Sequence, residues 1–186
     1  MSDWIAELQS SLSREFGDKP IVATLATVDK SGAPRARSII CRRVADDGSL
    51  FITTDSRSEK SEQLKATPQT EIVFWLPGLR EQFRVLGAAR TIGVAPSDAP
   101  LRQELWRGLS DATRATFHWP SPGAKKIDPD SSFADAIGAD APIPANFDVI
   151  VIRPKRVEHL QLWTQPHRRR RWMLAGKWSA AAELNP

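Results

Sequence analysis

Two short segments of this chain concentrate cationic and hydroxyl side chains. Arg37 and Arg42 lie in the first segment, and Arg57, Ser58 and Lys60 lie in the second. A phosphate monoester carries close to two negative charges, and proteins hold it with guanidinium forks, the point charge of a lysine and hydroxyl donors. The two segments supply all three kinds of donor, so the sequence predicts a site for a phosphorylated ligand.

The residues around the first segment have the patterns of strands joined by short turns. A β-branched stretch covers residues 21–28, and residues 35–44 alternate in part between polar and apolar side chains. The turn between them, at residues 29–34, is typical of a hairpin. A second turn at residues 46–48 leads to a strand over 50–54. Three strands joined in this way predict an antiparallel meander.

Helices are predicted before and after the meander. Apolar residues at helical spacing predict an amphipathic helix over residues 3–16. Ser58 is a helix-capping residue type and predicts a short helix that ends near Lys65. Ser97 and Asp98 open a third helical region. Because the short helix begins inside the basic segment, the free N–H groups of its N-terminus add to an anion site.

The remaining strands lead to a prediction of the whole fold. They cover residues 70–76, 81–92, 147–152, 157–163 and 168–174, with a break at Pro154. Residues 119–144 are rich in Pro, Gly, Ser, Asp and Ala, which predicts a loop. About seven strands predict a mainly β fold of the α+β class, a small antiparallel β-barrel with flanking helices. Closure of such a barrel removes its exposed strand edges.

Length and composition favour one domain over residues 1–186 that folds in a reducing compartment. The hydrophobic fraction is 41%, which is ordinary for a globular protein. The N-terminus has no basic stretch followed by an apolar one, and no apolar run reaches the length of a membrane span. A single cysteine, Cys41, excludes an internal disulfide, and the three histidines have no metal-ligand spacing. We therefore expect a cytoplasmic protein without a metal site.

A block of four arginines near the C-terminus contributes much of the net charge of +4. The block covers residues 168–171 and follows His167. A basic block of this kind is one feature of nucleic-acid-binding proteins. Trp163, Trp172 and Leu174 flank it, however, and this pattern favours a half-buried strand over a disordered basic tail.

The order of these fragments resembles the pyridoxamine 5'-phosphate oxidase family, the FMN-binding split β-barrel. The resemblance covers residues 20–95 well and 147–186 loosely. Within the family, the chain is most similar to the branch of uncharacterised FMN-binding relatives. Arg42 stands where the family's Arg-(four residues)-Lys strand has its lysine. The fragments that carry the resemblance are Ala23–Asp29 with Gly32 and Pro34, Arg37–Arg42, Phe51–Thr53, Ser56–Lys60, Gln63-Leu64 with Pro68, and Gln82.

The resemblance implies an FMN-dependent oxidoreductase that forms a homodimer with two FMN sites at the subunit interface. It implies cofactor contacts from Arg37, Ser38, Ile39, Ile40, Arg42, Ile52, Thr53, Arg57, Ser58, Lys60, Gln82, Trp119, Ser121, Arg170 and Arg171. Trp119, Ser121 and the Arg170/Arg171 pair are candidates for the second subunit's contribution. The implied substrate contacts are Arg42, His167 and Arg168.

Each of these residues also has an ordinary structural interpretation. Arg37 and Arg42 suit a solvated strand face, and because strand side chains alternate they cannot both point straight at one phosphate. The resemblance assigns the phosphate to Arg37 and the flavin edge or the substrate to Arg42. Gln82 suits an exposed strand position, but its amide offers the donor and the acceptor that match the polar edge of an isoalloxazine.

Departures from the family pattern leave the substrate open. The oxidase uses a tyrosine on its substrate phosphate, whereas this chain has no tyrosine. Its Arg-x-His element is replaced here by a histidine, His167, that precedes the arginines. Two alternatives therefore stay open: a flavin- or haem-binding protein without vitamin B6 oxidase activity, and a basic nucleic-acid-binding barrel.

Overall fold

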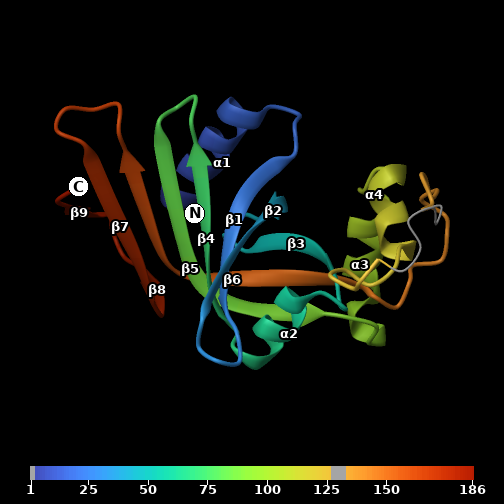
Figure 1. Ribbon diagram of the computed structural model, residues 1–186. Coiled ribbons are helices and arrows are strands. Elements are labelled where there is room, and N and C mark those ends of the chain that lie inside the picture. The colour runs from blue at the N-terminus through green and yellow to red at the C-terminus, as the bar shows by residue number, and fades with distance from the viewer. Residues whose placement is uncertain (1–2, 127–132) are drawn as a thin grey trace.

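The structure, a computed structural model, describes residues 3–126 and 133–186 (Figure 1). Six antiparallel strands close into a barrel in the order β1-β2-β3-β6-β5-β4, because β3 pairs with β6 as well as with β2. The barrel strands are β1 (Ile21–Val28), β2 (Pro34–Val44), β3 (Leu50–Asp55), β4 (Gln69–Leu76), β5 (Glu81–Ile92) and β6 (Phe147–Gln161). The predicted mainly β barrel with flanking helices is confirmed.

Three further strands and four helices surround the barrel. β7 (Arg168–Ala175) extends the sheet beyond β6, and β8 (Lys177–Trp178) and β9 (Ala182–Leu184) pair with β7. The helices are α1 (Asp3–Phe16), α2 (Glu59–Ala66), α3 (Ala99–Arg107) and α4 (Asp111–Ala115), with 3-10 turns η1 (Pro96–Asp98) and η2 (Thr116–His118). Among the described helices, none has the length and apolarity needed to cross a membrane.

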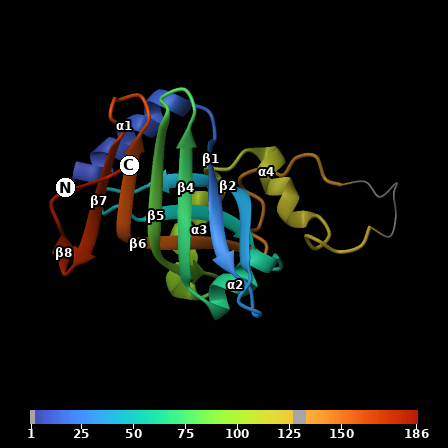
Figure 2. The same ribbon diagram turned by 60° about the vertical axis from the view of Figure 1, so that its left-hand side comes forward.

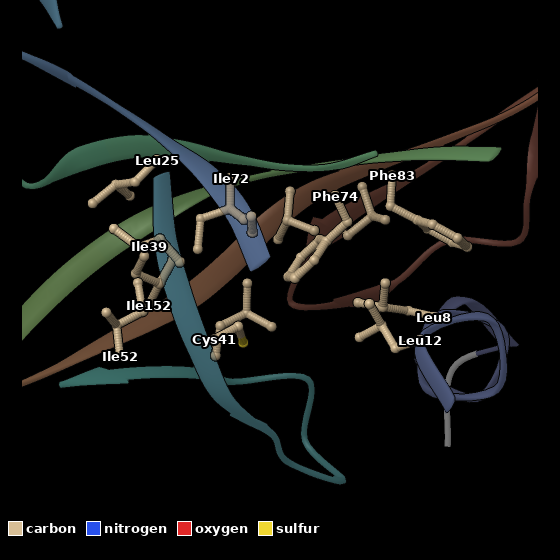
Figure 3. Close-up of a cluster of buried hydrophobic side chains, with 14 of the residues drawn as sticks. Leu8, Leu12, Leu25, Ile39, Cys41, Ile52, Ile72, Phe74, Phe83 and Ile152 are labelled. Carbon is tan, nitrogen blue, oxygen red and sulfur yellow. The ribbon is translucent and has the colours of Figure 1, made fainter. Parts of the chain in front are cut away.

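The barrel interior and α1 form one core. Leu8 and Leu12 of α1 lie near Phe74 and Phe83 at one end of the barrel (Figure 3). Cys41 belongs to the same core, and burial raises the pKa of its thiol to about 11. The thiol is therefore protonated at neutral pH and acts as a small hydrophobic side chain.

A second core joins the α3–α4 region to the outside of the barrel. The rings of Trp106 and Phe147 meet edge to face with centroids 5.1 Å apart, and the centroid of Phe117 lies 4.9 Å from that of Phe147. Figure 1 shows α3 and α4 to one side of the barrel, beside β3 and the start of β6, and Figure 2 shows α4 beyond the edge formed by β1 and β2. This packing fixes η2, which precedes Trp119.

Two buried arginines hold the loop before β6 in place. Arg102 donates from Nε and Nη2 to the carbonyl oxygen of Phe147, at 3.0 and 2.8 Å, and from Nη2 to that of Pro144 at 3.0 Å. Arg114 donates to the carbonyl oxygen of Ile137 at 2.7 Å and to that of Leu109. Hydrogen bonds from a charged donor are about twice as strong as neutral ones, so these contacts replace secondary structure in this region.

The predicted break at Pro154 is wrong, because β6 runs unbroken from Phe147 to Gln161. The register shifts between Leu86 and Gly87, so that Arg156 pairs with Leu86 and Pro154 pairs with Gly87. A bulge tolerates a proline because the ladder does not need its N–H at that point. A Cβ at Gly87 would collide with the carbonyl oxygen of Arg153, so a glycine is required opposite the bulge.

We expect Gly87→Ala to lower the free energy of unfolding by about 1–3 kcal/mol, because the added methyl group forces β5 and β6 apart. Urea denaturation measures this change. Gly138→Ala is the matched control, since a Cβ there meets nothing within 4 Å. Equal stability of the two variants would contradict the close approach of Gly87 on β5 to the backbone of Arg153 on β6.

Candidate functional site

A hollow of ≈ 340 Å³ lies between the ends of β2 and β3, the start of α2 and the segment that follows α4. Arg42 and Lys60 supply cations to the lining of the hollow, and Phe117 and Trp119 supply aromatic side chains, which we call the aromatic wall. The complete lining consists of Arg42, Thr53, Thr54, Asp55, Lys60, Thr113, Thr116, Phe117, Trp119, Pro120 and Pro122.

Arg42 reaches the hollow from a bulge in β2. The register between β2 and β3 shifts between Cys41 and Arg43, so Arg42 departs from the regular alternation of the strand. Its Nε donates to Oγ1 of Thr53 on β3 at 3.2 Å, which directs the guanidinium along the surface of the hollow. Burial lowers the pKa of Arg42 below the ordinary arginine value.

Lys60 lies in the first turn of α2, where its Nζ donates to Oγ of Ser58 at 3.1 Å. Burial lowers the pKa of Lys60, the nearby Arg37 lowers it further, and Asp55 opposes both effects. Ser58 occupies the N-cap position, but its hydroxyl makes no capping bond to the helix. It donates instead to the carbonyl oxygen of Asp55 at 2.7 Å. The predicted position of Ser58 is confirmed, whereas the predicted side-chain cap is not formed.

Arg37 approaches the start of α2 from the β1–β2 hairpin. Its Nη1 donates to Oγ1 of Thr27 at 2.5 Å, and its Nη2 donates to Oε1 of Gln63 at 2.8 Å. Both acceptors are neutral, and burial lowers the pKa of the guanidinium. Arg37 is therefore held in one orientation beside Lys60 without a carboxylate of its own.

Arg37, Arg42 and Lys60 share one property: within residues 3–126 and 133–186, none of them forms an ion pair. Their hydrogen-bond partners are hydroxyl or amide oxygens. Partly buried cations without an ion-pair partner cost stability, and burial lowers the pKa of each of the three for the same reason, although the charges of Glu59 and Asp55 partly offset it at Arg37 and Lys60. Such an arrangement is expected where an anionic ligand supplies the missing charge.

Arg57, the fourth predicted cation, is arranged differently. Its Nη2 donates to Oδ2 of Asp55 at 2.6 Å, and its Nε lies 3.0 Å from Oδ1 of the same carboxylate. The same Nη2 donates to the carbonyl oxygen of Trp119 at 3.0 Å. Arg57 is therefore neutralised by Asp55 and is not part of the lining of the hollow.

A second group of predicted site residues lies on the outer face of β5, β6 and β7. Gln82 and Arg169 line a smaller hollow of ≈ 90 Å³ together with Arg84, Glu158 and Leu160. The register places Arg84 opposite Glu158, and Glu158 opposite Arg171. In the sheet order, β1 and β4 separate this group from β2. One copy of the chain thus presents the predicted ligands in two separate groups.

The arginine block of β7 is largely neutralised within the chain. Three of its members form ion pairs: Arg168 with Glu183, Arg169 with Glu158, and Arg170 with Glu7. Arg170 also lies against buried His159, so it ties α1 to the sheet and faces away from the hollow's side of the barrel. The predicted half-buried strand is confirmed, and the pairing weakens the nucleic-acid alternative, which depends on free cations.

The other predicted residues occupy varied positions. Ile39 and Ile52 point into the barrel core, so only their backbone is available to a ligand, while Ser38 and Ile40 alternate onto the outer face. Ser121 is exposed in the loop beyond Trp119. Nδ1 of His167 lies 3.0 Å from the carbonyl oxygen of Thr164 in the β6–β7 turn.

Several residues of the hollow were missed from the sequence. Thr113, Thr116 and Phe117 belong to α4 and η2, and their spacing carries no signal for a ligand. Asp55 had a local signal, since an acidic residue two positions before an arginine favours a local ion pair. The family resemblance, by contrast, implies an external phosphate as the partner of Arg57.

Comparison with known proteins identifies the family. Residues 1–93 match the family described as "Pyridoxamine 5'-phosphate oxidase, FMN-binding domain". The chain belongs to this family. It is also similar over its whole length to the crystal structure of a pyridoxamine 5'-phosphate oxidase-related, FMN binding protein from Nostoc punctiforme. The TM-score is 0.88 at 31% identity, and the match covers 100% of this chain and 99% of that one.

Curated relatives are similar over a smaller share of their length. The chain is 33% identical over 137 residues to a pyridoxine/pyridoxamine 5'-phosphate oxidase of Thermosynechococcus vestitus, covering 74% of this chain and 60% of that protein. It is 31% identical over 153 residues to the protein of the same name in Rhodococcus jostii, covering 77% and 65%. The chain thus spans somewhat less than two thirds of these relatives.

We expect Lys60→Met to raise the ligand-free protein's free energy of unfolding by about 0.5–1 kcal/mol, because it removes a desolvated cation that has no ion pair. Thermal unfolding in a buffer without multivalent anions measures the change. Added inorganic phosphate should raise the melting temperature of the wild type more than that of the variant. If the variant were less stable than the wild type and phosphate still raised its melting temperature by the same amount, Lys60 would not be part of an anion site.

Proposed function

We propose that this protein is an FMN-dependent oxidoreductase related to pyridoxamine 5'-phosphate oxidase. The observation that carries the proposal is the set of Arg37, Arg42 and Lys60, three partly buried cations around the start of α2 that form no ion pair with any residue the structure describes. Two of them line a hollow that Phe117 and Trp119 line as well. Cations and aromatic rings around one hollow suit a planar ring system that carries a phosphate ester. Membership of an FMN-binding family supports this choice of ligand.

In this proposal the protein binds and orients the cofactor. Arg37 and Lys60 hold the phosphate, with the N-terminus of α2 and Ser58 beside them. Arg42 and Thr53 also line the hollow, and in this proposal they meet the ribityl chain, the ring edge or the substrate. Bound FMN supplies hydride transfer, and the protein supplies position and a fixed electrostatic environment.

We further propose that the cofactor site is completed by a second copy of the chain. Gln82 and Arg171, with Arg169 beside them, lie on a face that is separated from Arg42 by β1 and β4. The same face exposes apolar side chains, with Val22 and Trp75 each 46% exposed. Exposed apolar strand residues of this kind are typical of a protein interface. A twofold pairing through this face would bring the two groups of ligands together.

For the substrate we propose a chemical class and no single compound. Arg42, His167 and Arg168 are the candidate contacts, which favours an anionic compound with an oxidisable amine or hydroxyl carbon. Arg168 is paired with Glu183, so of the three only Arg42 offers an arginine without an ion pair in the described residues. Vitamin B6 phosphates satisfy the class, and an oxidase reaction on them is the first activity to test.

We expect Lys60→Ala to weaken FMN binding by about 10–100-fold, the loss of one charge-assisted hydrogen bond. Binding of riboflavin, which lacks the phosphate, should change little. Fluorescence titration of the flavin-free protein measures both affinities, and Lys65→Ala, on the exposed face of the same helix, is the matched control. An equal loss for both flavins would remove Lys60 from the phosphate site.

Mass spectrometry of the ligand released from the purified protein tests the cofactor itself, and release of FMN is the expected result. Peroxide production from pyridoxamine 5'-phosphate in air then tests the oxidase reaction. Bound FMN without turnover would favour the alternative of a flavin-binding protein without B6 oxidase activity. Release of haem, or of no flavin at all, would overturn the proposal.

We expect Trp75→Glu to convert the dimer into monomers and to lower FMN affinity at the same time, because a buried carboxylate at the interface is left unpaired. Light scattering coupled to size-exclusion chromatography measures the mass. Val94→Glu is the control, since Val94 is an exposed apolar residue beyond the end of β5. A monomeric variant with undiminished FMN affinity would show that one chain forms the whole site.

A further inference from the structure

Asp55, Arg57 and Asn146 form a hydrogen-bonded unit that joins the start of α2 to the aromatic wall of the hollow. Asp55 ends β3, Arg57 lies in the turn that leads to α2, and Asn146 immediately precedes β6. We name this unit the clasp. Its members come from two segments about ninety positions apart, which the pairing of β3 with β6 brings together.

The carboxylate of Asp55 is the centre of the clasp. It accepts from the backbone N–H of Arg57 at 2.8 Å, from Nη2 of Arg57 at 2.6 Å and from Nδ2 of Asn146 at 2.9 Å. Burial acts to raise the pKa of Asp55, but the hydrogen bonds from Arg57 and Asn146 outweigh it and hold the pKa below its ordinary value. The carboxylate therefore stays ionised and keeps all three donors.

Two arms extend from this centre to the aromatic wall. Nη2 of Arg57 donates to the carbonyl oxygen of Trp119 at 3.0 Å. Nδ2 of Asn146 donates to the carbonyl oxygen of Phe117 at 2.9 Å. Phe117 and Trp119 both line the hollow, so each arm holds the backbone of one wall residue.

The two wall residues differ in their other contacts, because the ring of Phe117 packs on Phe147 of β6 whereas Trp119 has its further contacts in its own turn and in the loop before β6. The backbone N–H of Trp119 donates within its own turn, to the carbonyl oxygen of Thr116 at 3.3 Å. The indole Nε1 of Trp119 donates to the carbonyl oxygen of Ala134, and its ring meets Phe133 edge to face, both in the loop before β6. The clasp is thus the polar connection between this wall and the turn that carries Ser58 and Lys60.

We propose that Arg57 is a positioning residue, which sets the distance between the aromatic wall and the cations of α2 through Asp55 and the carbonyl oxygen of Trp119. This proposal rests on the proposed function for the identity of the ligand. It departs from the sequence-based assignment of Arg57 as a phosphate ligand, because the guanidinium is already neutralised by Asp55. The clasp fixes the position of the aromatic wall and does not contact the phosphate, so its loss affects every flavin to the same degree.

Titration with two flavins distinguishes a positioning residue from a phosphate ligand. We expect Arg57→Ala to weaken FMN and riboflavin alike, by about tenfold each, since charge-assisted hydrogen bonds are lost away from the phosphate. The ratio of the two affinities then stays at its wild-type value, whereas Lys60→Ala lowers it. A fall of the ratio in Arg57→Ala would overturn the proposal and return Arg57 to the phosphate.

Hydrogen exchange of the flavin-free protein provides a readout that does not depend on the cofactor. We expect Arg57→Ala and Asn146→Ala each to speed exchange in peptides that contain residues 56–57 and 117–120, and to leave the peptides of β4 and β5 unchanged. Asn146→Ala removes the hydrogen bond to the carbonyl oxygen of Phe117, so it tests the clasp independently if Arg57→Ala does not fold. Arg90→Ala is the control, because Arg90 belongs to an exposed ion pair with Asp98.

The outcomes separate the two proposals. Unchanged exchange in both clasp variants overturns the clasp, whatever the flavin titrations give. Faster exchange together with a wild type that binds neither flavin supports the clasp and overturns the proposed function. Faster exchange together with an equal loss of both flavins supports both proposals.

Discussion

The pairing of β3 with β6 is the constraint on which the barrel and the candidate site both depend. It joins Leu50 to Ile152 at one end and Asp55 to Phe147 at the other, and so closes six strands into a barrel. Closure removes the free edges that a meander would otherwise expose. The same pairing puts the end of β3, with Thr53 and Asp55, against the loop that returns from α4. A site made from distant segments is therefore a direct consequence of closing the sheet.

The cationic side chains of the protein differ in the kind of partner that the fold gives them. Several arginines are neutralised by a carboxylate from another element, as Arg170 is by Glu7 and Arg169 by Glu158. In the described residues, Arg37, Arg42 and Lys60 instead have only neutral oxygens as hydrogen-bond partners. Buried Arg102 forms no ion pair there either, but it secures the carbonyl oxygens of Pro144 and Phe147. A missing ion pair therefore points to a ligand only where several such cations gather, as they do around the start of α2.

The region between α3 and β6 shows how irregular backbone is made rigid. Arg102 and Arg114 are buried, and they donate to main-chain carbonyl oxygens that no strand or helix satisfies. Together with the ring cluster of Trp106, Phe117 and Phe147, they hold the aromatic wall beside the barrel. A loop fixed in this way suits one side of a binding site, because no conformational entropy is lost in ordering it when a ligand binds.

The sequence predicts the antiparallel barrel and its flanking helices, and the structure confirms both. Residues 21–28 and 81–92 were read as strands to the residue, because periodicity and turn residues are local properties. The course of β6 through Pro154 emerges only in three dimensions, because β6 bulges between Pro154 and Arg156 where it approaches Gly87 of the partner strand. The partners of the cations were likewise not predictable from local sequence. Arg57 and Lys60 are similar cations in neighbouring positions, but only Arg57 donates to the carboxylate of Asp55 and to the carbonyl oxygen of Trp119. Contacts with a distant residue such as Trp119 depend on which atoms the fold brings within hydrogen-bonding distance.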